Sequence, residues 1–240
     1  MQETIHKHTS FTLEIIYHLG TYENSIHFIF DHASKKCSIV DPAWDADLFI
    51  DRVKERGYEL TDIWLTHWHP DHTNAVDELA HKTGANITAG INEVPYLRLE
   101  HPIKTVEDND IVSIGNTDAR IINTPGHTAG GICYALDGHL IAGDTLFVYG
   151  AGHCVMPGGS ANIFFNSLQK LKQLPDDMML HCGHDYGSTI SSTMGEQKKG
   201  NPFLLIDDED DFVRYRNNIH DGSRTYPMSA MTKDEVYALL

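Results

Sequence analysis

Hydrophobic residues alternate between strand-like and helix-like patterns in the first part of the chain. Residues 13–20 (LEIIYHLG) and 25–42 (SIHFIFDHASKKCSIVDP) are rich in β-branched and aromatic residues around short polar breaks, which predicts a strand followed by a hairpin. Residues 45–57 have a helical period, with Asp45 as a candidate N-cap and Gly57 at the end. A strand at residues 61–67 and a helix at residues 74–84 continue the β-α-β-α order.

From about residue 110 the pattern changes to short strand-like runs at residues 110–114, 119–124, 131–136 and 139–143. The turn signals Gly115-Asn116 and Asp137-Gly138 lie between these runs, so we expect a meander of antiparallel strands. A helix at residues 161–175 and a buried strand at residues 178–183 follow. The two halves are therefore expected to form two packed sheets with helices outside.

The C-terminal part carries an acidic start and a basic end in the segment DDEDDFVRYRNN, residues 207–218, as the dipole of a helix favours. We expect this segment to cover an edge of the fold rather than to form a separate domain. The prediction for the whole chain is one domain over residues 1–240, with a short helical extension at about residues 190–240.

Composition narrows the possible partners. The chain has 34 acidic and 18 basic residues and a formal charge of -16, which disfavours nucleic acid and anionic membranes as partners. There is no apolar run of about eighteen residues, and the N-terminal residues lack the apolar core of a signal peptide. We therefore expect a cytoplasmic protein. Its four cysteines have no C-x-x-C spacing, so reduced thiols are expected.

The segment THWHPDHT, residues 66–73, concentrates metal-binding residue types directly after an apolar run. Three further residues of these types follow apolar runs in TPGHTAGG, IAGDTLF and LHCGHDYG. Loops at strand ends can converge on one site, and five histidines with two carboxylates suit two ions of zinc, iron or manganese. The candidate metal ligands are His67, His69, Asp71, His72, His127, Asp144 and His184. Most other histidines, among them His6, His8, His32, His81 and His101, are expected to be surface residues.

In this order, the motifs H-x-H-x-D-H, Gly-His, Gly-Asp-Thr and Gly-His resemble those of the metallo-β-lactamase superfamily over about residues 13–190. The resemblance implies a four-layer αβ/βα sandwich with two metal ions and a metal-bound water or hydroxide between them. It places the ligands in two sets, which are His67, His69 and His127 for one ion and Asp71, His72 and His184 for the other, with Asp144 as the bridge.

The same resemblance gives two carboxylates additional roles. Asp71 is both a ligand and the candidate catalytic proton carrier. Asp41, in the motif IVDP, is the candidate residue behind the ligands, although an Asp-Pro turn explains it nearly as well.

Within the superfamily, THWHPDHT, TPGHTAGG, GDTLF and CGHDY look most like glyoxalase II, the hydroxyacylglutathione hydrolase that cleaves the thioester S-lactoylglutathione. Two features depart from that family. The segment GAGHC stands where the family usually has Gly-Cys-Gly-Arg, and only 56 residues follow His184, fewer than the glutathione-binding helical domain needs. His153 occupies the place of the arginine, so it is a candidate substrate contact or a loop residue without a role.

The segment 184–202 (HDYGSTISSTMGEQKKGNP) is also similar to persulfide dioxygenases, which have the same fold. That resemblance implies one iron held by His67, His127 and Asp144. A lactonase or another hydrolase of this fold is a further alternative, as is a metal-binding scaffold without catalytic activity. In each enzymatic interpretation the partner is a small molecule, a thioester or a thiol in the first two, and the oligomeric state is not predicted.

Overall fold

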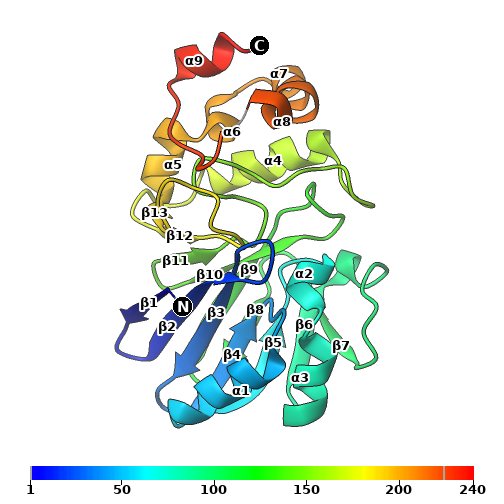
Figure 1. Ribbon diagram of the computed structural model, residues 1–240, viewed down its shortest axis with the longest axis vertical. Coiled ribbons are helices and arrows are strands. Elements are labelled where there is room, and N and C mark those ends of the chain that lie inside the picture. Colours follow the sequence, from blue (N-terminus) through cyan, green and yellow to red (C-terminus); the bar gives the residue numbers. More distant parts are fainter. Residues whose placement is uncertain (1, 224) are drawn as a thin grey trace.

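The computed structural model describes residues 2–223 and 225–240, and these form two sheets packed face to face (Figure 1). The first sheet contains, in spatial order, β1 (Glu3–Lys7), β2 (Phe11–Leu19), β3 (Asn24–Asp31), β4 (Lys36–Val40), β5 (Glu59–Trp64), β6 (Asn86–Gly90) and β7 (Ile103–Val106). The second contains β13 (Ser192–Thr193), β12 (Met179–His181), β11 (His139–Ile141), β10 (Ile132–Leu136), β9 (Thr117–Asn123) and β8 (Ile111–Ile114). The predicted meander is β8 to β11, whose neighbouring strands pair antiparallel.

Helices cover the outer face of each sheet. The helices α1 (Ala46–Glu55) and α3 (Val76–Thr83) pack on the first sheet, and α4 (Ala161–Leu171) packs on the second. Apolar side chains from both sheets fill the space between them. The order of layers is therefore helix, sheet, sheet, helix, which confirms the four-layer αβ/βα sandwich.

Local signals explain where several elements begin and end. The side chain of Asp45 accepts a hydrogen bond from the Leu48 N–H at 2.9 Å and caps α1, as predicted. Gly84 ends α3 in the left-handed region, with a φ of 75°. The predicted helix at residues 161–175 is shorter, because α4 already ends at Leu171.

Four strands were not predicted from the sequence: β1, β6, β7 and β13. Each has five residues or fewer. A strand this short gives little alternation of apolar and polar positions, so its pairing depends on the neighbouring strand rather than on its own sequence.

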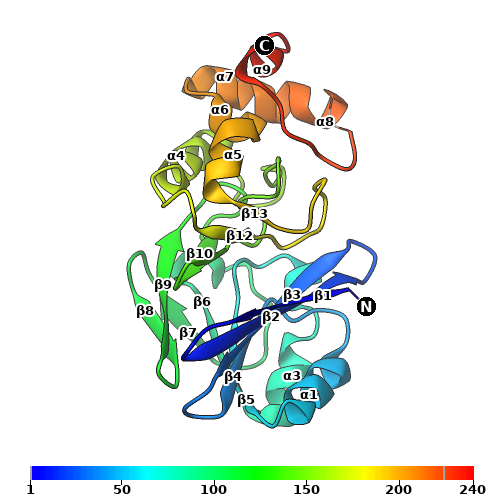
Figure 2. The same cartoon turned by 90° about the vertical axis from the view of Figure 1, so that its left-hand side faces the viewer.

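The chain after β13 forms short helices that stack on α4 (Figure 2). They are α5 (Met194–Gly200), α6 (Pro202–Leu205), α7 (Glu209–Arg214), the π-helical turn η2 (Tyr215–Ile219), α8 (His220–Ser223) and α9 (Lys233–Tyr237). The ring centroids of Phe164 on α4 and Phe212 on α7 are 6.3 Å apart. The segment 207–218 therefore packs on α4. Among the described residues, no helix has the length and apolar character needed to cross a membrane.

A row of histidines lies where β1 and β3 approach the second sheet. This histidine row consists of His6, His8, His27, His139 and His181. The Nε2 atoms of His8 and His139 are 2.7 Å apart, and Nδ1 of His139 lies 2.8 Å from Nε2 of His181. The expectation that His6 and His8 are only surface residues is wrong, because alternate positions of β1 face inward.

Burial lowers the pKa values of four of these rings, those of His6, His27, His139 and His181, and favours their neutral form. It lowers the pKa of His27 to about 3 and that of His139 to about 4. The imidazoles of an unfolded chain titrate near pH 6.5, so below that pH the unfolded state binds protons that the folded state cannot. The stability linked to these rings is therefore complete above about pH 6.5 and is lost as the pH falls toward 3.

We expect the free energy of unfolding to fall between pH 6.5 and pH 4, with each such ring contributing up to about 1.4 kcal/mol per pH unit. His27→Leu should make this dependence shallower, because it removes one buried ring. Urea unfolding at a series of pH values measures the slope, and His81→Gln, at an exposed position, is the control. Parallel slopes in the parent and in His27→Leu would contradict the prediction.

Candidate metal centre

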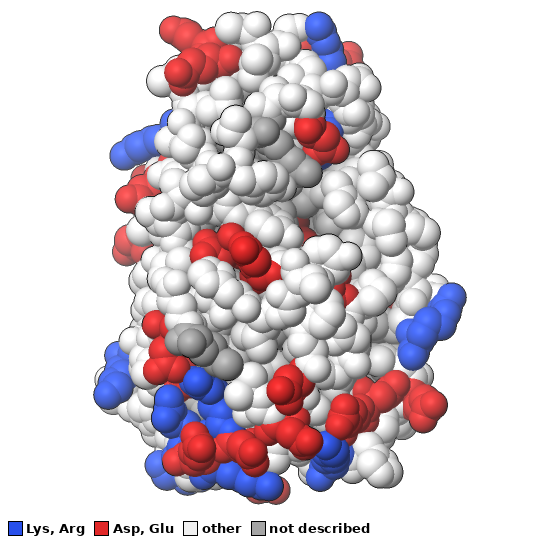
Figure 3. Space-filling view, viewed as in Figure 1, with Lys and Arg blue, Asp and Glu red and all other residues white. Residues whose placement is uncertain are grey.

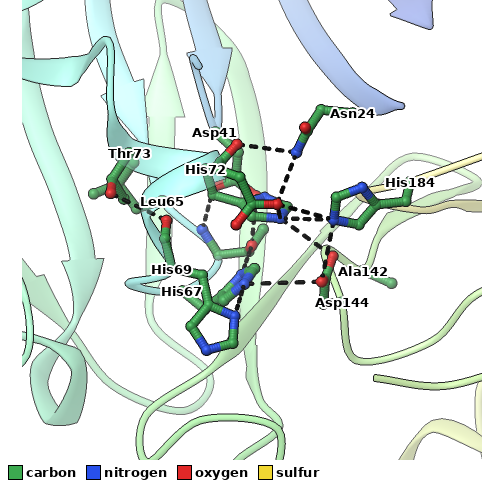
Figure 4. A network of polar contacts seen from close by, with 12 residues as sticks. Asn24, Asp41, Leu65, His67, His69, His72, Thr73, Ala142, Asp144 and His184 are labelled. Carbon is green, nitrogen blue, oxygen red and sulfur yellow. Dashed lines mark hydrogen bonds and ion pairs between the residues drawn. The ribbon is translucent and has the colours of Figure 1, made fainter. Parts of the chain in front are cut away.

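The segment THWHPDHT follows β5 and crosses the edge of the first sheet. Residues 66–69 run as an extended loop, and the short helix α2 (Pro70–Thr73) begins with a proline, which suits the first turn of a helix. His127 lies between β9 and β10, Asp144 follows β11, and His184 follows β12. All seven predicted residues meet at this edge, where both sheets contribute loops. Figure 4 shows five of them, His67, His69, His72, Asp144 and His184, pointing toward one another.

One group of possible ligands consists of His67, His69, His127 and Asp144, all of them buried. Nδ1 of His69 lies 3.1 Å from Nε2 of His67 and 3.1 Å from Nε2 of His127. Asp144 Oδ2 is 3.7 Å from the His127 Nε2 atom. Spacings of this size suit nitrogen and oxygen ligands at about 2.0–2.2 Å from one ion.

A second group consists of Asp71, His72 and His184. The Nε2 atoms of His72 and His184 are 3.1 Å apart, and Asp71 Oδ2 is 3.5 Å from the first and 3.4 Å from the second. Asp144 also reaches this group, because its Oδ1 lies 3.4 Å from His72 and its Oδ2 lies 3.3 Å from His184. One carboxylate therefore contacts both groups.

In four of the five histidines, a hydrogen bond to Nδ1 holds the ring. We call Nδ1 of these rings the outer nitrogen, because Nε2 faces the other ligands. The partners of Nδ1 are Thr66 Oγ1 for His67 at 2.9 Å, Asp41 Oδ2 for His72 at 3.1 Å, the carbonyl of His153 for His127 at 2.5 Å and the carbonyl of Tyr22 for His184 at 2.7 Å. Each Nδ1–H donates to an oxygen, so in the neutral ring each Nε2 presents a lone pair to the centre. Lone pairs at 3.1 Å from one another repel unless a cation or a proton lies among them. The donor set therefore fits divalent metal ions.

The pKa values of the histidines agree with this arrangement. Burial lowers the pKa of His67 well below its ordinary value, that of His69 to about 4 and that of His127 to about 3, so these rings are neutral. Burial would also lower the pKa of His72, but the carboxylates of Asp144 and Asp41 raise it to about 9. The carboxylates around His72 therefore stabilise positive charge at this position.

Asp41 lies behind the two groups, as the family resemblance implied. Its Oδ1 accepts from the Thr66 N–H at 2.7 Å, and its Oδ2 accepts from the Thr66 hydroxyl at 2.5 Å. The φ of Asp41 is 52°, a strained value for a residue other than glycine. Asp41 thus orients His72 directly and His67 through Thr66.

Comparisons with known proteins agree with this geometry. Residues 24–184 match the model of the "Metallo-beta-lactamase superfamily". The chain belongs to this superfamily. A "Probable polyketide biosynthesis zinc-dependent hydrolase BaeB" of Bacillus velezensis is 34% identical over 198 residues, which are 82% of this chain and 88% of that protein. A "Hydroxyacylglutathione hydrolase" of Maricaulis maris is 30% identical over 223 residues, 78% of this chain and 84% of that protein.

Solved structures of this superfamily have the same arrangement of layers. The crystal structure of ETHE1 from Myxococcus xanthus aligns with a TM-score of 0.79 and 27% identity, over 87% of this chain and 91% of that one. The resemblance to the superfamily is thus confirmed, and its relatives include proteins named as zinc-dependent hydrolases.

His153 lies beside the first group of ligands, with its ring centroid 4.9 Å from that of His127. Its carbonyl orients His127, and its side chain lines the cavity above the centre. The backbone carbonyl of His153 thus fixes the orientation of His127. Contact between the His153 side chain and a substrate stays a prediction.

Sequence reasoning missed Glu93, which is fully buried at the end of η1 (Ile91–Glu93). Its carboxylate accepts from the Trp68 N–H at 2.7 Å and from the Gly130 N–H at 2.6 Å. Trp68 lies between His67 and His69, and Gly130 lies three residues after His127. Glu93 therefore ties together the two loops that carry the first group, and no local motif marks it.

Asn24 was missed as well. Its side-chain N–H group donates to the Asp71 carbonyl at 2.9 Å and approaches the Asp71 carboxylate at 3.3 Å. Asn24 begins β3, 47 positions before Asp71, so only the folded chain reveals the contact.

Glu93→Gln should weaken metal binding, because the amide replaces one of two acceptor oxygens with a group that cannot accept a hydrogen bond. Loosening of a residue that orients ligands commonly reduces metal affinity by about 10- to 100-fold. Competition with a chromogenic chelator measures the zinc affinity, and Glu78→Gln on the exposed face of α3 provides the matched control. Equal affinities in the two variants would show that Glu93 does not support the ligands.

Proposed function

We propose that this protein is a binuclear metallohydrolase that cleaves a thioester or an ester in the manner of glyoxalase II. The observation that carries the proposal is the position of Asp144, whose two oxygens contact both groups of ligands. Two cations held by these groups would lower the pKa of a shared water toward neutrality and would polarise the substrate carbonyl. The chain then needs no nucleophile of its own.

Asp71 is the residue that we assign to proton transfer. Its side chain is 20% exposed and lines the cavity, whereas the histidines beside it are buried. The bonds from Asn24 hold it in place. A carboxylate at this position can accept a proton from the attacking water and return it to the leaving thiol or alcohol, so that the first products are a carboxylic acid and a neutral leaving group, and the acid then releases its proton to solvent.

The donor types favour zinc, because the proposed ligands are imidazole nitrogens and carboxylate oxygens. The relatives named as zinc-dependent hydrolases support the same choice. Iron or manganese would also be compatible with these ligands. We propose a small-molecule substrate, since the cavity above the centre has a volume of 480 Å³.

A mononuclear iron persulfide dioxygenase is the second candidate. The similarity to ETHE1 over 87% of the chain favours it, together with the sequence of residues 184–202. In that reaction His67, His127 and Asp144 would hold the metal, and His72 and His184 would hold none. The number of metal ions per chain therefore separates the two candidates.

For the hydrolase we expect two zinc ions per chain in the parent and one in His72→Ala and in His184→Ala. Loss of the second ion should reduce kcat/KM for thioester hydrolysis by about a hundred-fold or more, since each metal contributes several kcal/mol of transition-state stabilisation. Elemental analysis after controlled loading measures the stoichiometry, and His81→Ala is the control. The hydrolase proposal would be contradicted, and the dioxygenase supported, by one iron per chain in the parent and in both variants together with oxygen uptake on glutathione persulfide.

A further inference from the structure

Five of the residues that line the cavity above the metal centre are tyrosine, tryptophan or phenylalanine. These aromatic residues are Tyr22, Trp44, Phe147, Tyr186 and Tyr226. Among the described residues that line it, none is lysine or arginine. On the face shown in Figure 3, acidic side chains lie near the middle, and most lysine and arginine side chains lie toward the lower end and the margins. A substrate that carries several negative charges would find little compensation on this wall.

Trp44 is held at the mouth of this cavity in a strained conformation. Its φ is 81°, a value that residues other than glycine rarely adopt. Its indole N–H donates to Asn24 Oδ1 at 2.8 Å, and its backbone N–H donates to Asn74 Oδ1 at 2.7 Å. The side chain nevertheless remains 38% exposed. Strain that is maintained to keep a large apolar ring in contact with solvent indicates a binding role.

The space for the indole depends on Gly20. A Cβ atom at that position would lie 2.2 Å from Trp44 Cε2, so no other residue fits without moving the ring. Gly20 also has a φ of 64°, which favours glycine. Gly20, in the turn before β3, and Trp44, three residues after Asp41, are thus matched to each other in shape.

Tyr22 lies beside Trp44, with its ring inclined at 45° to the indole. Its ring centroid is 6.2 Å from that of Trp44, and its side chain is 55% exposed. We call these two side chains the aromatic platform. The platform is coupled to the metal centre at two points, because Asn24 bonds both Trp44 and Asp71, and the Tyr22 carbonyl accepts from His184. A group bound on the platform is thereby held close to the reacting carbonyl.

We propose that the aromatic platform of Trp44 and Tyr22 binds a planar aromatic acyl group of the substrate. The proposal rests on the hydrolase function proposed above and specifies its substrate class. Aromatic rings stack on aromatic rings with an attraction beyond that of the buried area, whereas a saturated ring of similar size gains only the burial. The preferred substrates are therefore uncharged aryl-acyl thioesters or esters.

The test compares three thioesters of the same neutral thiol, N-acetylcysteamine, with acetyl, cyclohexylacetyl and phenylacetyl groups. In the parent we expect kcat/KM for the phenylacetyl thioester to exceed that for the acetyl thioester by at least ten-fold and that for the cyclohexylacetyl thioester by several-fold. Trp44→Leu and Tyr22→Leu should each bring the phenylacetyl to cyclohexylacetyl ratio toward one. Trp44→Phe, which keeps a ring, should retain part of the ratio.

Tyr237→Leu is the matched control, because Tyr237 is an exposed tyrosine on α9 and does not line the cavity. The proposal is overturned if the parent cleaves the phenylacetyl and cyclohexylacetyl thioesters equally well, or if the platform variants leave their ratio unchanged. It is also overturned if Trp44 raises kcat/KM for thioesters of an aromatic thiol but not for thioesters that carry an aromatic acyl group.

A binding measurement separates this proposal from the proposed function. Titration calorimetry of the zinc-loaded protein with phenylacetate, cyclohexylacetate and acetate, the product carboxylates, does not require hydrolysis. We expect phenylacetate to bind at least ten-fold more tightly than acetate in the parent, and this difference to be largely lost in Trp44→Leu. If no thioester or ester is cleaved but this pattern is observed, the hydrolase function fails and the platform is supported. Equal affinities for the three carboxylates would overturn the platform.

Discussion

The candidate centre depends on one constraint: each of four imidazoles must be fixed by its outer nitrogen so that its inner nitrogen faces the other ligands. A hydroxyl, a carboxylate and two backbone carbonyls provide these bonds, and each belongs to a different part of the chain. The constraint explains why the loops after β2, β4, β5, β9, β11 and β12 are so closely packed. At Gly183, for example, a Cβ atom would lie 2.3 Å from Asp144 Oδ1. An imidazole that lacked its outer partner could rotate, and its lone pair would no longer converge with the others.

The sequence predicted the parts of this arrangement that local chemistry determines. The residues of THWHPDHT are informative together, because few structures need four metal-binding side chains within six positions. Asp41 was identified through the family resemblance, and the structure provides its bonds to Thr66 and His72. Asp45 and Gly84 mark the ends of α1 and α3 because capping is a local property.

The residues that escaped prediction act over long sequence distances and through backbone groups. Glu93 binds the N–H groups of residues 25 positions before it and 37 positions after it, and such contacts leave no motif. His6 and His8 were misassigned for a related reason, since their burial follows from the packing of β1 beside the second sheet. Edge strands of this kind are difficult to recognise because their short sequences carry little periodic signal.

The C-terminal extension contributes to the cavity as well as to the core. Asn201 donates from its side chain to the carbonyls of Phe147 and Gly150, at 3.1 and 3.0 Å, and buried Arg216 donates to the carbonyls of Ala151 and Gly152. Three of these residues, Phe147, Ala151 and Gly152, line the cavity on the stretch that runs from β11 toward His153, whose carbonyl orients His127. The helices that follow His184 thus support the metal centre through the backbone of the cavity wall. A different extension would change the position of Phe147 and the shape of the cavity while leaving the ligand motifs intact, so the motifs alone identify the superfamily but do not determine the substrate.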